Sequence, residues 1–286
     1  MIKPFLEYLK NVKDASPHTL RNYEIDLAHF HDFVKKELPD IERKDIREYL
    51  ASLYEAGKSK RTCARKLSAL RSYFHHAVGQ KWIVKNPVEE IELPKLEKKL
   101  PPSLSYDQVK VLLDQPDLSN YLGLRDRTMM ELLYSSGLRV SELAQINKMD
   151  IDFEQKLVRL KGKGKKERIV PFTINARDWI RQYLDSPERE ESDREAVFLN
   201  KFGDRLTTRS IDRLFAAYLK QSGLSARITP HTIRHTIATH WLENGMDLKT
   251  IQLILGHSNL ATTTIYTQVS LSLKKKVYDE THPRAK

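Results

Sequence analysis

The sequence predicts a mainly α-helical protein with a small β-hairpin, in which an all-helical N-terminal domain precedes a mixed α+β domain. Three observations lead to this fold class. Apolar residues recur at helical spacing through residues 1–92, a stretch rich in proline and charge follows, and one pair of short alternating strands interrupts the helices of the second half. A chain of 286 residues is also long enough to form two domains.

The N-terminal half begins with a clear helix signal. Ser16 can cap a helix with its hydroxyl, and the ring of Pro17 fits the first helical position. The apolar residues that follow at helical spacing predict one buried stripe, formed by Leu20, Tyr23, Leu27, Phe30 and Phe33. A shorter helix is expected around residues 46–53, ending near Gly57. A third is expected from about 59 to 78, with a buried face of Leu67, Leu70, Phe74 and Val78.

The start of this third helix is densely basic. The run consists of Lys58, Lys60, Arg61, Arg65, Lys66 and Arg71. Few acidic residues interrupt it, which favours a surface that contacts phosphates over an ordinary solvated face. The whole chain carries 49 Lys and Arg against 38 Asp and Glu, which also fits a polyanionic partner.

A linker is predicted between the two domains. Residues 94–102 contain three prolines and four charged side chains, which leave little to pack, and proline disfavours helix on both sides. The expected boundaries are 1–95 for the helical domain, 96–103 for the linker and 104–286 for the mixed domain.

The second half alternates helices with one hairpin. Helices are expected near 106–114, 125–136, 140–146, 174–184, 207–221, 231–243, 247–255 and 259–266. Residues 158–160 and 168–170 are predicted strands, and the turn between them places Lys163 between two glycines. Residues 196–199 are a further candidate strand.

Four short patterns in this half carry side chains suited to chemistry. They centre on Arg139 with Glu142, on Lys163, on His231 with Arg234, and on His257 with Tyr266 nine residues later. Arg139 follows a glycine that ends a helix, and Glu142, one helical turn on, could brace its guanidinium. His231 and Arg234 share one face of a helix that opens after a proline.

Each pattern also has a structural interpretation. Arg139 could serve only an ion pair, Lys163 could be a solvated loop lysine, and Tyr266 could be a packed aromatic. His231 and His235 at helical spacing could suggest zinc, but the glutamate that a zinc-protease helix needs is missing and no cysteine cluster is present. We therefore expect no metal and no other cofactor.

Taken together, the patterns resemble the tyrosine recombinase, or phage-integrase, family, and most closely its Xer-type members. The family's order is Gly-Leu-Arg-x-Ser-Glu-Leu, a Gly-Lys-Gly hairpin turn, His-x-Leu-Arg-His, Leu-Gly-His and then Tyr. All five motifs stand here in that order, and the resemblance covers nearly the whole chain. Ile233 replaces the usual leucine, which is an apolar exchange.

The resemblance implies a catalytic set of Arg139, Lys163, His231, Arg234, His257 and Tyr266, with Glu142 in support. Tyr266 would be the nucleophile that forms a 3′-phosphotyrosyl bond. Paired guanidinium donors can stabilise the charge on the phosphate without a metal ion. Lys163 would protonate the departing 5′ oxygen as general acid. A free tyrosine has a pKa of about 10, so the two histidines would help it to attack at neutral pH.

The function implied by the resemblance is site-specific DNA recombination that resolves chromosome dimers. The partners would be duplex DNA with a specific recombination site and further copies of the chain, as a tetramer on two sites. A second recombinase and a DNA translocase stay open as partners. Two rival functions are a type IB topoisomerase, against which the short helical N-terminal half argues, and a non-catalytic DNA-binding protein, against which the complete motif set argues.

The remaining features concern location and the tail. One cysteine, no N-terminal signal peptide and no long apolar segment predict a cytoplasmic protein without a membrane partner. After Tyr266 the chain has the pattern of a short amphipathic helix, with three lysines, Lys274 to Lys276, among the apolar residues Val269, Leu271, Leu273, Val277 and Tyr278. This tail could pack on its own domain, but the resemblance favours docking into a neighbouring subunit.

Overall fold

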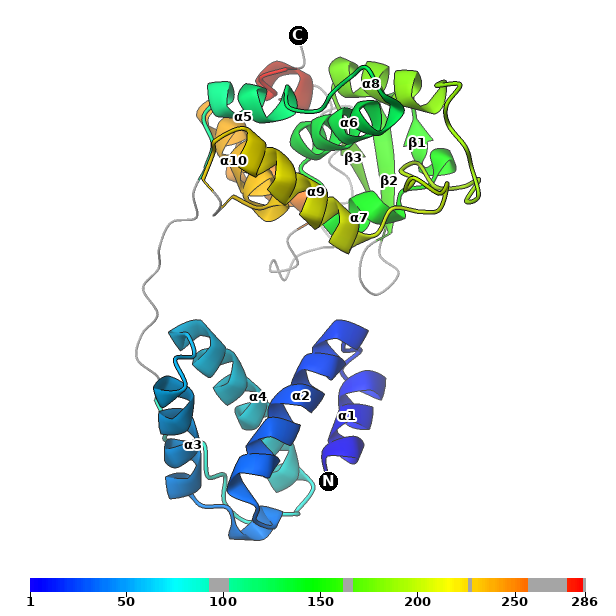
Figure 1. The fold of residues 1–286 in the computed structure, drawn as a ribbon. Helices are drawn as coiled ribbons and strands as arrows, with labels where there is room; N and C mark the ends of the chain where they lie inside the picture. The colour runs from blue at the N-terminus through cyan, green and yellow to red at the C-terminus, as the bar shows by residue number, and fades with distance from the viewer. Residues whose placement is uncertain (93–102, 162–166, 226–227, 257–276, 285–286) are drawn as a thin grey trace. The chain divides into compact units, whose positions relative to one another are not determined.

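The chain forms two compact units, Met1–Lys99 and Leu100–Lys286, which are described separately (Figure 1). The computed structural model describes residues 1–92, 103–161, 167–225, 228–256 and 277–284. Both units are mainly helical and the second carries a three-stranded antiparallel sheet, which confirms the predicted fold class. Within these described ranges, no helix combines the length and hydropathy needed to cross a membrane.

The N-terminal unit is built around its second helix. Its helices are α1 Ile2–Asn11, α2 Pro17–Val34, α3 Arg43–Glu55 and α4 Lys60–Gly79, with a short 3-10 turn, η1, at Leu38–Asp40. Helix α2 contacts α1, α3 and α4, and the four helices enclose one apolar core. Ser16 caps α2 as predicted, because its hydroxyl accepts a hydrogen bond from the Thr19 amide at 3.2 Å.

The predicted apolar stripe of α2 is confirmed at its centre. Leu27 and Phe30 are fully buried, while Leu20 and Tyr23 are partly buried against the same core. Phe33 departs from the prediction, since it is 42% exposed. It lies at the last turn of α2, where its ring reaches only the edge of the core.

The basic run of α4 is partly internal to the unit, which corrects one prediction. The Lys66 ammonium lies 3.0 Å from Oδ1 of buried Asp26 on α2, and its side chain is only 9% exposed. Arg65 binds the other oxygen of Asp26, and Arg71 donates to the Ile91 carbonyl. Lys66 therefore does not lie on an open phosphate-contacting face, because a carboxylate forty residues earlier holds it inside.

The second unit surrounds one central helix. Its helices are α5 Tyr106–Leu113, α6 Tyr121–Ser136, α7 Val140–Gln145, η2 Lys148–Asp150, α8 Ile174–Leu184, α9 Thr208–Gln221, α10 Pro230–Glu243 and α11 Leu248–Leu255. Every residue of α6 from Gly123 to Ser136 is buried. The neighbours of α6 are α5, α7, α8, α10 and strand β3, so the ends of this helix position the elements around it (Figure 1).

The sheet contains the predicted hairpin and one unpredicted strand. Its strands are β1 Ile151–Asp152, β2 Leu157–Lys161 and β3 Glu167–Pro171, in the order β1-β2-β3. The hairpin register runs from Leu157 opposite Pro171 to Lys161 opposite Glu167. Residues 196–199 form two isolated bridges, to Asn147 and Arg205, instead of the predicted strand. The helix predicted at 259–266 lies outside the described residues.

The described part of the tail, residues 277–284, packs on its own unit. Tyr278 is fully buried, and its hydroxyl donates to the Ser135 carbonyl of α6. Arg284 lies 3.0 Å from the buried carboxylate of Glu131, also on α6. In the described part of the tail, the partners of these residues come from the same chain; residues 267–276, which belong to the same expectation, lie outside the described residues, so docking of the tail into a neighbouring subunit stays a prediction.

We predict that Asp26→Ala destabilises the N-terminal unit by about 3 kcal/mol, the scale for leaving a buried charge without its partner. The stranded charge is Lys66, whereas half-exposed Arg65 turns to solvent. Amide hydrogen exchange of α2 and α4 in the full chain measures the loss. Asp32→Ala, on the exposed face of the same helix, is the control and should change stability by less than about 0.5 kcal/mol.

The paired replacement Asp26→Leu with Lys66→Met removes both charges and should recover most of the lost protection. Unchanged exchange in Asp26→Ala would contradict the role of this buried pair.

Candidate active site

Two helix ends meet at the centre of the candidate site. Helices α6 and α11 both end at a glycine in the left-handed conformation, Gly137 and Gly256, each with φ +64°. A Cβ on Gly137 would lie 2.7 Å from Cδ2 of Leu255, so this position needs glycine for its backbone and for the close approach of α11. The last carbonyls of a helix lack partners within the helix. The two ends thus gather acceptor oxygens at one place.

Arg234 of α10 joins these two helix ends. Its Nη1 donates to the Gly137 carbonyl and its Nη2 to the Leu255 carbonyl. The residue is only 4% exposed. Burial, and then the charge of Arg139, lowers the pKa of Arg234 to about 10. The guanidinium therefore stays charged at neutral pH while it is fixed between two helices.

Arg139, at the N-cap of α7, is fixed on one side and open on the other. Its backbone N–H and its Nη1 each donate to Glu142 at 2.8 Å, and its Nη2 donates to the Gly256 carbonyl at 3.0 Å. The side chain is nevertheless 41% exposed. Arg139 can therefore present donors to an external anion without giving up its position.

Arg168 of β3 completes the cluster, and the sequence patterns did not single it out. Its Nη1 and Nη2 donate to the two oxygens of Glu142 at 2.6 and 2.8 Å. Burial would raise the pKa of Glu142, but the bonds from Arg168 and Arg139 hold it at about 2. A signal was present in the sequence, since Arg168 shares the inward face of the strand with buried Val170 while Glu167 and Ile169 point outward.

The other predicted residues divide into two groups. His231 lies in the first turn of α10, exposed and one helical turn before Arg234. Lys163, His257 and Tyr266 lie outside the described residues. The structure therefore brings together Arg139, Glu142 and Arg234 from the predicted set and adds Arg168.

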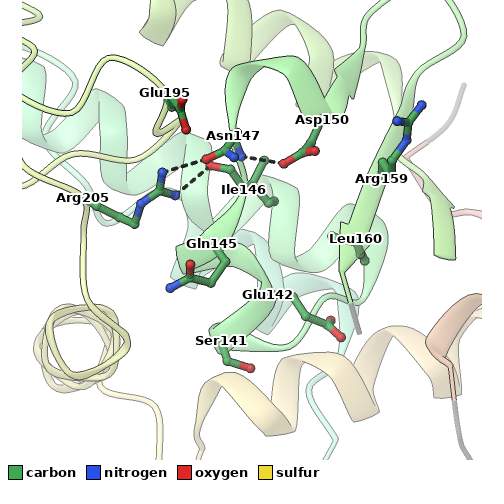
Figure 2. Close-up of a pocket in the computed structure, with 10 residues that line it drawn as sticks. All are labelled: Ser141, Glu142, Gln145, Ile146, Asn147, Asp150, Arg159, Leu160, Glu195 and Arg205. Atoms are coloured by element: carbon green, nitrogen blue, oxygen red, sulfur yellow. Dashed lines mark hydrogen bonds between the residues drawn. The ribbon is translucent and has the colours of Figure 1, made fainter. Parts of the chain in front are cut away.

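A pocket opens beside this cluster, along α7 and β2 (Figure 2). Glu142 and Ser141 stand at one end of it, and Arg205 with Asn147 at the other. Arg205 donates to the Asn147 side chain at 2.7 Å, so that end is already paired. In the part of the chain that the structure describes, no group of three His, Cys, Asp or Glu side chains could hold a metal ion.

The charges of the cluster suit an anion. Three guanidiniums, of Arg139, Arg168 and Arg234, face one carboxylate, Glu142, which leaves a formal excess of two positive charges. Guanidinium groups present planar paired donors that match phosphate oxygens and remain charged when partly buried. The arrangement can therefore stabilise negative charge on a phosphodiester.

We predict that Glu142 makes the second unit acid-sensitive. Its pKa is depressed from 4.5 to about 2, so its stabilisation is complete above about pH 5 and is lost as pH falls towards 2. Between about pH 6 and pH 3.5 the wild type should lose about 1 kcal/mol more stability than Glu142→Gln.

Urea unfolding in a Trp82→Phe background measures this difference, because the remaining tryptophans, Trp179 and Trp241, both belong to the second unit. Equal acid-side slopes for the two proteins would count against the ion-pair network.

Comparison with known proteins identifies the family. The phage integrase family model matches residues 102–272, and the model of the phage integrase N-terminal SAM-like domain matches residues 2–81. Tyrosine recombinase XerC of Chlamydia caviae is 54% identical, with 98% of each chain covered.

Solved structures show the same fold. The crystal structure of XerA recombinase has a TM-score of 0.52 at 28% identity and covers 99% of this chain and 98% of its own. The Tn1549 transposon integrase, in complex with circular intermediate DNA, has a TM-score of 0.73 at 20% identity, with coverage of 97% and 94%. The predicted resemblance is confirmed, and the chain belongs to the phage integrase family of tyrosine recombinases.

Proposed function

We propose that this chain cleaves and rejoins duplex DNA at a specific site, with Tyr266 as nucleophile, and that it resolves chromosome dimers in this way. The observation that carries the proposal is the cluster of Arg139, Glu142 and Arg234 at two helix ends. Family membership and the similarity to XerC proteins support the reaction class. The two rival functions, relaxation by a topoisomerase and binding without catalysis, predict different products from the same substrate.

The two arginines would act as a clamp on the scissile phosphate. The transition state spreads extra negative charge over the non-bridging oxygens, and fixed donors stabilise it because they need no reorganisation. Arg234 cannot turn away, since both its terminal nitrogens bind helix-end carbonyls. Arg139 offers its exposed side. Removing one such donor typically costs about 100- to 1000-fold in rate.

The proposed steps conserve the energy of the phosphodiester. Oη of Tyr266 attacks the phosphorus, the bond to the 5′ oxygen breaks, and Lys163 supplies the proton that this oxygen takes up. His231 and His257 would donate to the phosphate or exchange the proton of Tyr266. Because a phosphotyrosyl ester replaces the original ester, a 5′ hydroxyl from another strand can reverse the step without ATP.

Exposed basic residues of α4 are proposed to bind the DNA backbone. After the correction of Lys66, the exposed members of the run are Lys58, just before α4, and Lys60, Arg61, Arg65 and Arg71 on α4; of these, Arg65 binds Asp26 and Arg71 binds the Ile91 carbonyl. Exchange between two duplexes requires four strand breaks, and one nucleophilic tyrosine per chain then implies four chains on two sites. The proposed compartment is the cytoplasm, where the single buried cysteine, Cys63, stays reduced.

Variants of Tyr266 and Lys163 should distinguish the nucleophile from the general acid. Tyr266→Phe should bind DNA and form no covalent adduct. Lys163→Ala should cleave poorly because the 5′ oxygen leaves without a proton. With sulfur in place of that bridging oxygen the leaving group is a much weaker base, so cleavage by Lys163→Ala should recover and Tyr266→Phe should stay inactive. A suicide substrate that traps the covalent adduct measures each rate.

Failure of sulfur to rescue Lys163→Ala, while the wild type cleaves the sulfur substrate, would move the general acid to a histidine. Adduct formation by Tyr266→Phe would refute the nucleophile. The connectivity of wild-type products distinguishes strand exchange from relaxation, and recombination by this chain alone would make a second recombinase or a translocase unnecessary.

The second functional prediction concerns the basic run. Arg61→Ala should weaken binding to all DNA sequences and reduce the slope of log affinity against log salt by about one, as expected for one lost phosphate contact. Lys66→Met is the matched control within the same helix and should leave the slope unchanged, because its ammonium already binds Asp26. Fluorescence titrations at several salt concentrations measure both slopes. Equal slope changes in the two variants would overturn this assignment.

A further inference from the structure

We infer that Arg168 is a positioning residue for DNA cleavage, acting through Glu142 to fix the guanidinium of Arg139 towards the phosphate. The inference rests on the proposed cleavage reaction and adds to it a residue outside the five family motifs. It stands on the contacts among β3, α7 and the end of α11.

The carboxylate of Glu142 is fully occupied. It accepts four hydrogen bonds, two from Arg168 at 2.6 and 2.8 Å and two from Arg139 at 2.8 Å each. A carboxylate has about four lone-pair sites, so all of its acceptor sites are used by these four hydrogen bonds. Glu142 therefore holds Arg139 in one orientation as long as Arg168 holds Glu142 from the opposite side.

Arg168 is itself held firmly. Its strand position lies opposite Leu160 in the β2–β3 ladder. Its side chain packs along Gly256 so closely that a Cβ there would lie 2.9 Å from Cδ, 3.0 Å from Nε and 3.2 Å from Cζ of Arg168. The same glycine offers its carbonyl to Arg139. The sheet and the end of α11 thus fix both arginines on a common support.

Removing Arg168 would change what Glu142 does. With Arg139 as its one remaining hydrogen-bonding cation, the carboxylate would lose the partner on its other side and with it the fixed orientation that it gives Arg139, and the formal excess of positive charge would fall from two to one. Arg168 itself is only 17% exposed and is turned to Glu142, so it is poorly placed to bind DNA directly. The loss should therefore appear in the cleavage rate and not in DNA affinity.

Replacing Arg168 could also slow cleavage in a second way, through Lys163. Arg168 follows Glu167, which pairs with Lys161 across the two strands on either side of residues 162–166, the segment that contains Lys163. Its replacement could therefore disturb the general acid instead of Arg139. The two routes respond differently to a sulfur leaving group, because sulfur removes the need for a proton and leaves the need to stabilise non-bridging charge.

The main experiment measures single-turnover cleavage by Arg168→Gln on oxygen and sulfur substrates. We expect DNA affinity within about twofold of wild type and cleavage slower by about 10- to 100-fold, the scale for losing an outer hydrogen-bond partner of a functional group. Sulfur should restore Lys163→Ala but not Arg168→Gln. Arg181→Gln, an arginine 46% exposed on α8, is the matched control and should cleave like wild type.

Two further variants show whether Arg168 acts through Glu142. Glu142→Gln and the double variant Glu142→Gln with Arg168→Gln complete a mutant cycle. If the inference holds, adding the Arg168 change to Glu142→Gln costs less than about threefold, because coupled residues give non-additive losses. If the rate losses of the two single variants multiply in the double variant, the inference about Arg168 is wrong.

The pH profile gives a readout that a merely structural role would not move. The charged groups facing Glu142 are Arg139 from its own helix end, Arg168 from β3 and Arg234 from α10. Without Arg168 the pKa of Glu142 should rise, so the cleavage rate of Arg168→Gln relative to wild type should fall further as pH drops below neutral. This extra fall should be absent when Glu142 is also Gln.

The outcomes separate the inference from the function on which it rests. Absence of a covalent adduct with wild-type protein would refute the proposed cleavage. A cleaving wild type with an equally fast Arg168→Gln, or a variant rescued by sulfur, would refute only the role of Arg168. If Arg168→Gln fails to fold, Arg168→Lys is the substitute, since a single ammonium keeps the charge but cannot match both oxygens as the planar guanidinium does. It should show a smaller rate loss with the same insensitivity to sulfur.

Discussion

Positive charge can be concentrated at one point only if fixed negative groups hold it there. In this protein the fixed groups are the carboxylate of Glu142 and the carbonyls of Gly137, Leu255 and Gly256 at two helix ends. The close approach of α6 and α11 depends on the left-handed glycines Gly137 and Gly256. The position of the Arg168 guanidinium depends on the register of β3. The central burial of α6 matters for function because it fixes where the first of these helix ends stands.

Local patterns predicted the parts of this arrangement that depend on neighbours in the sequence. The cap at Ser16, the buried centre of α2 and the hairpin arise from residues a few positions apart. The same holds for the pair of Arg139 and Glu142, one helical turn apart. In these cases the spacing alone states which side chains can meet.

Contacts between side chains that are far apart in the sequence could not be predicted from local spacing. Lys66 reads as one of six similar cations, and only the packing of α4 on α2 shows that Asp26 holds it inside. Arg168 is separated from Glu142 by 26 positions, so no local spacing indicates that the two side chains meet. The contacts of Tyr278 with Ser135 and of Arg284 with Glu131 likewise join residues more than 140 positions apart, so no local pattern indicates them.

The use of arginine at the buried position follows from the same electrostatics. Burial and the neighbouring charge lower the pKa of Arg234 to about 10, and the group is still almost fully charged at neutral pH. A lysine starts at about 10.4, so an equal shift would bring it to about 8 and leave an appreciable fraction neutral. A lysine would also replace a rigid fork with a point charge, although Arg234 must reach the ends of two helices at once. Because burial fixes Arg234 in place, this position needs a side chain that remains positively charged when it is buried.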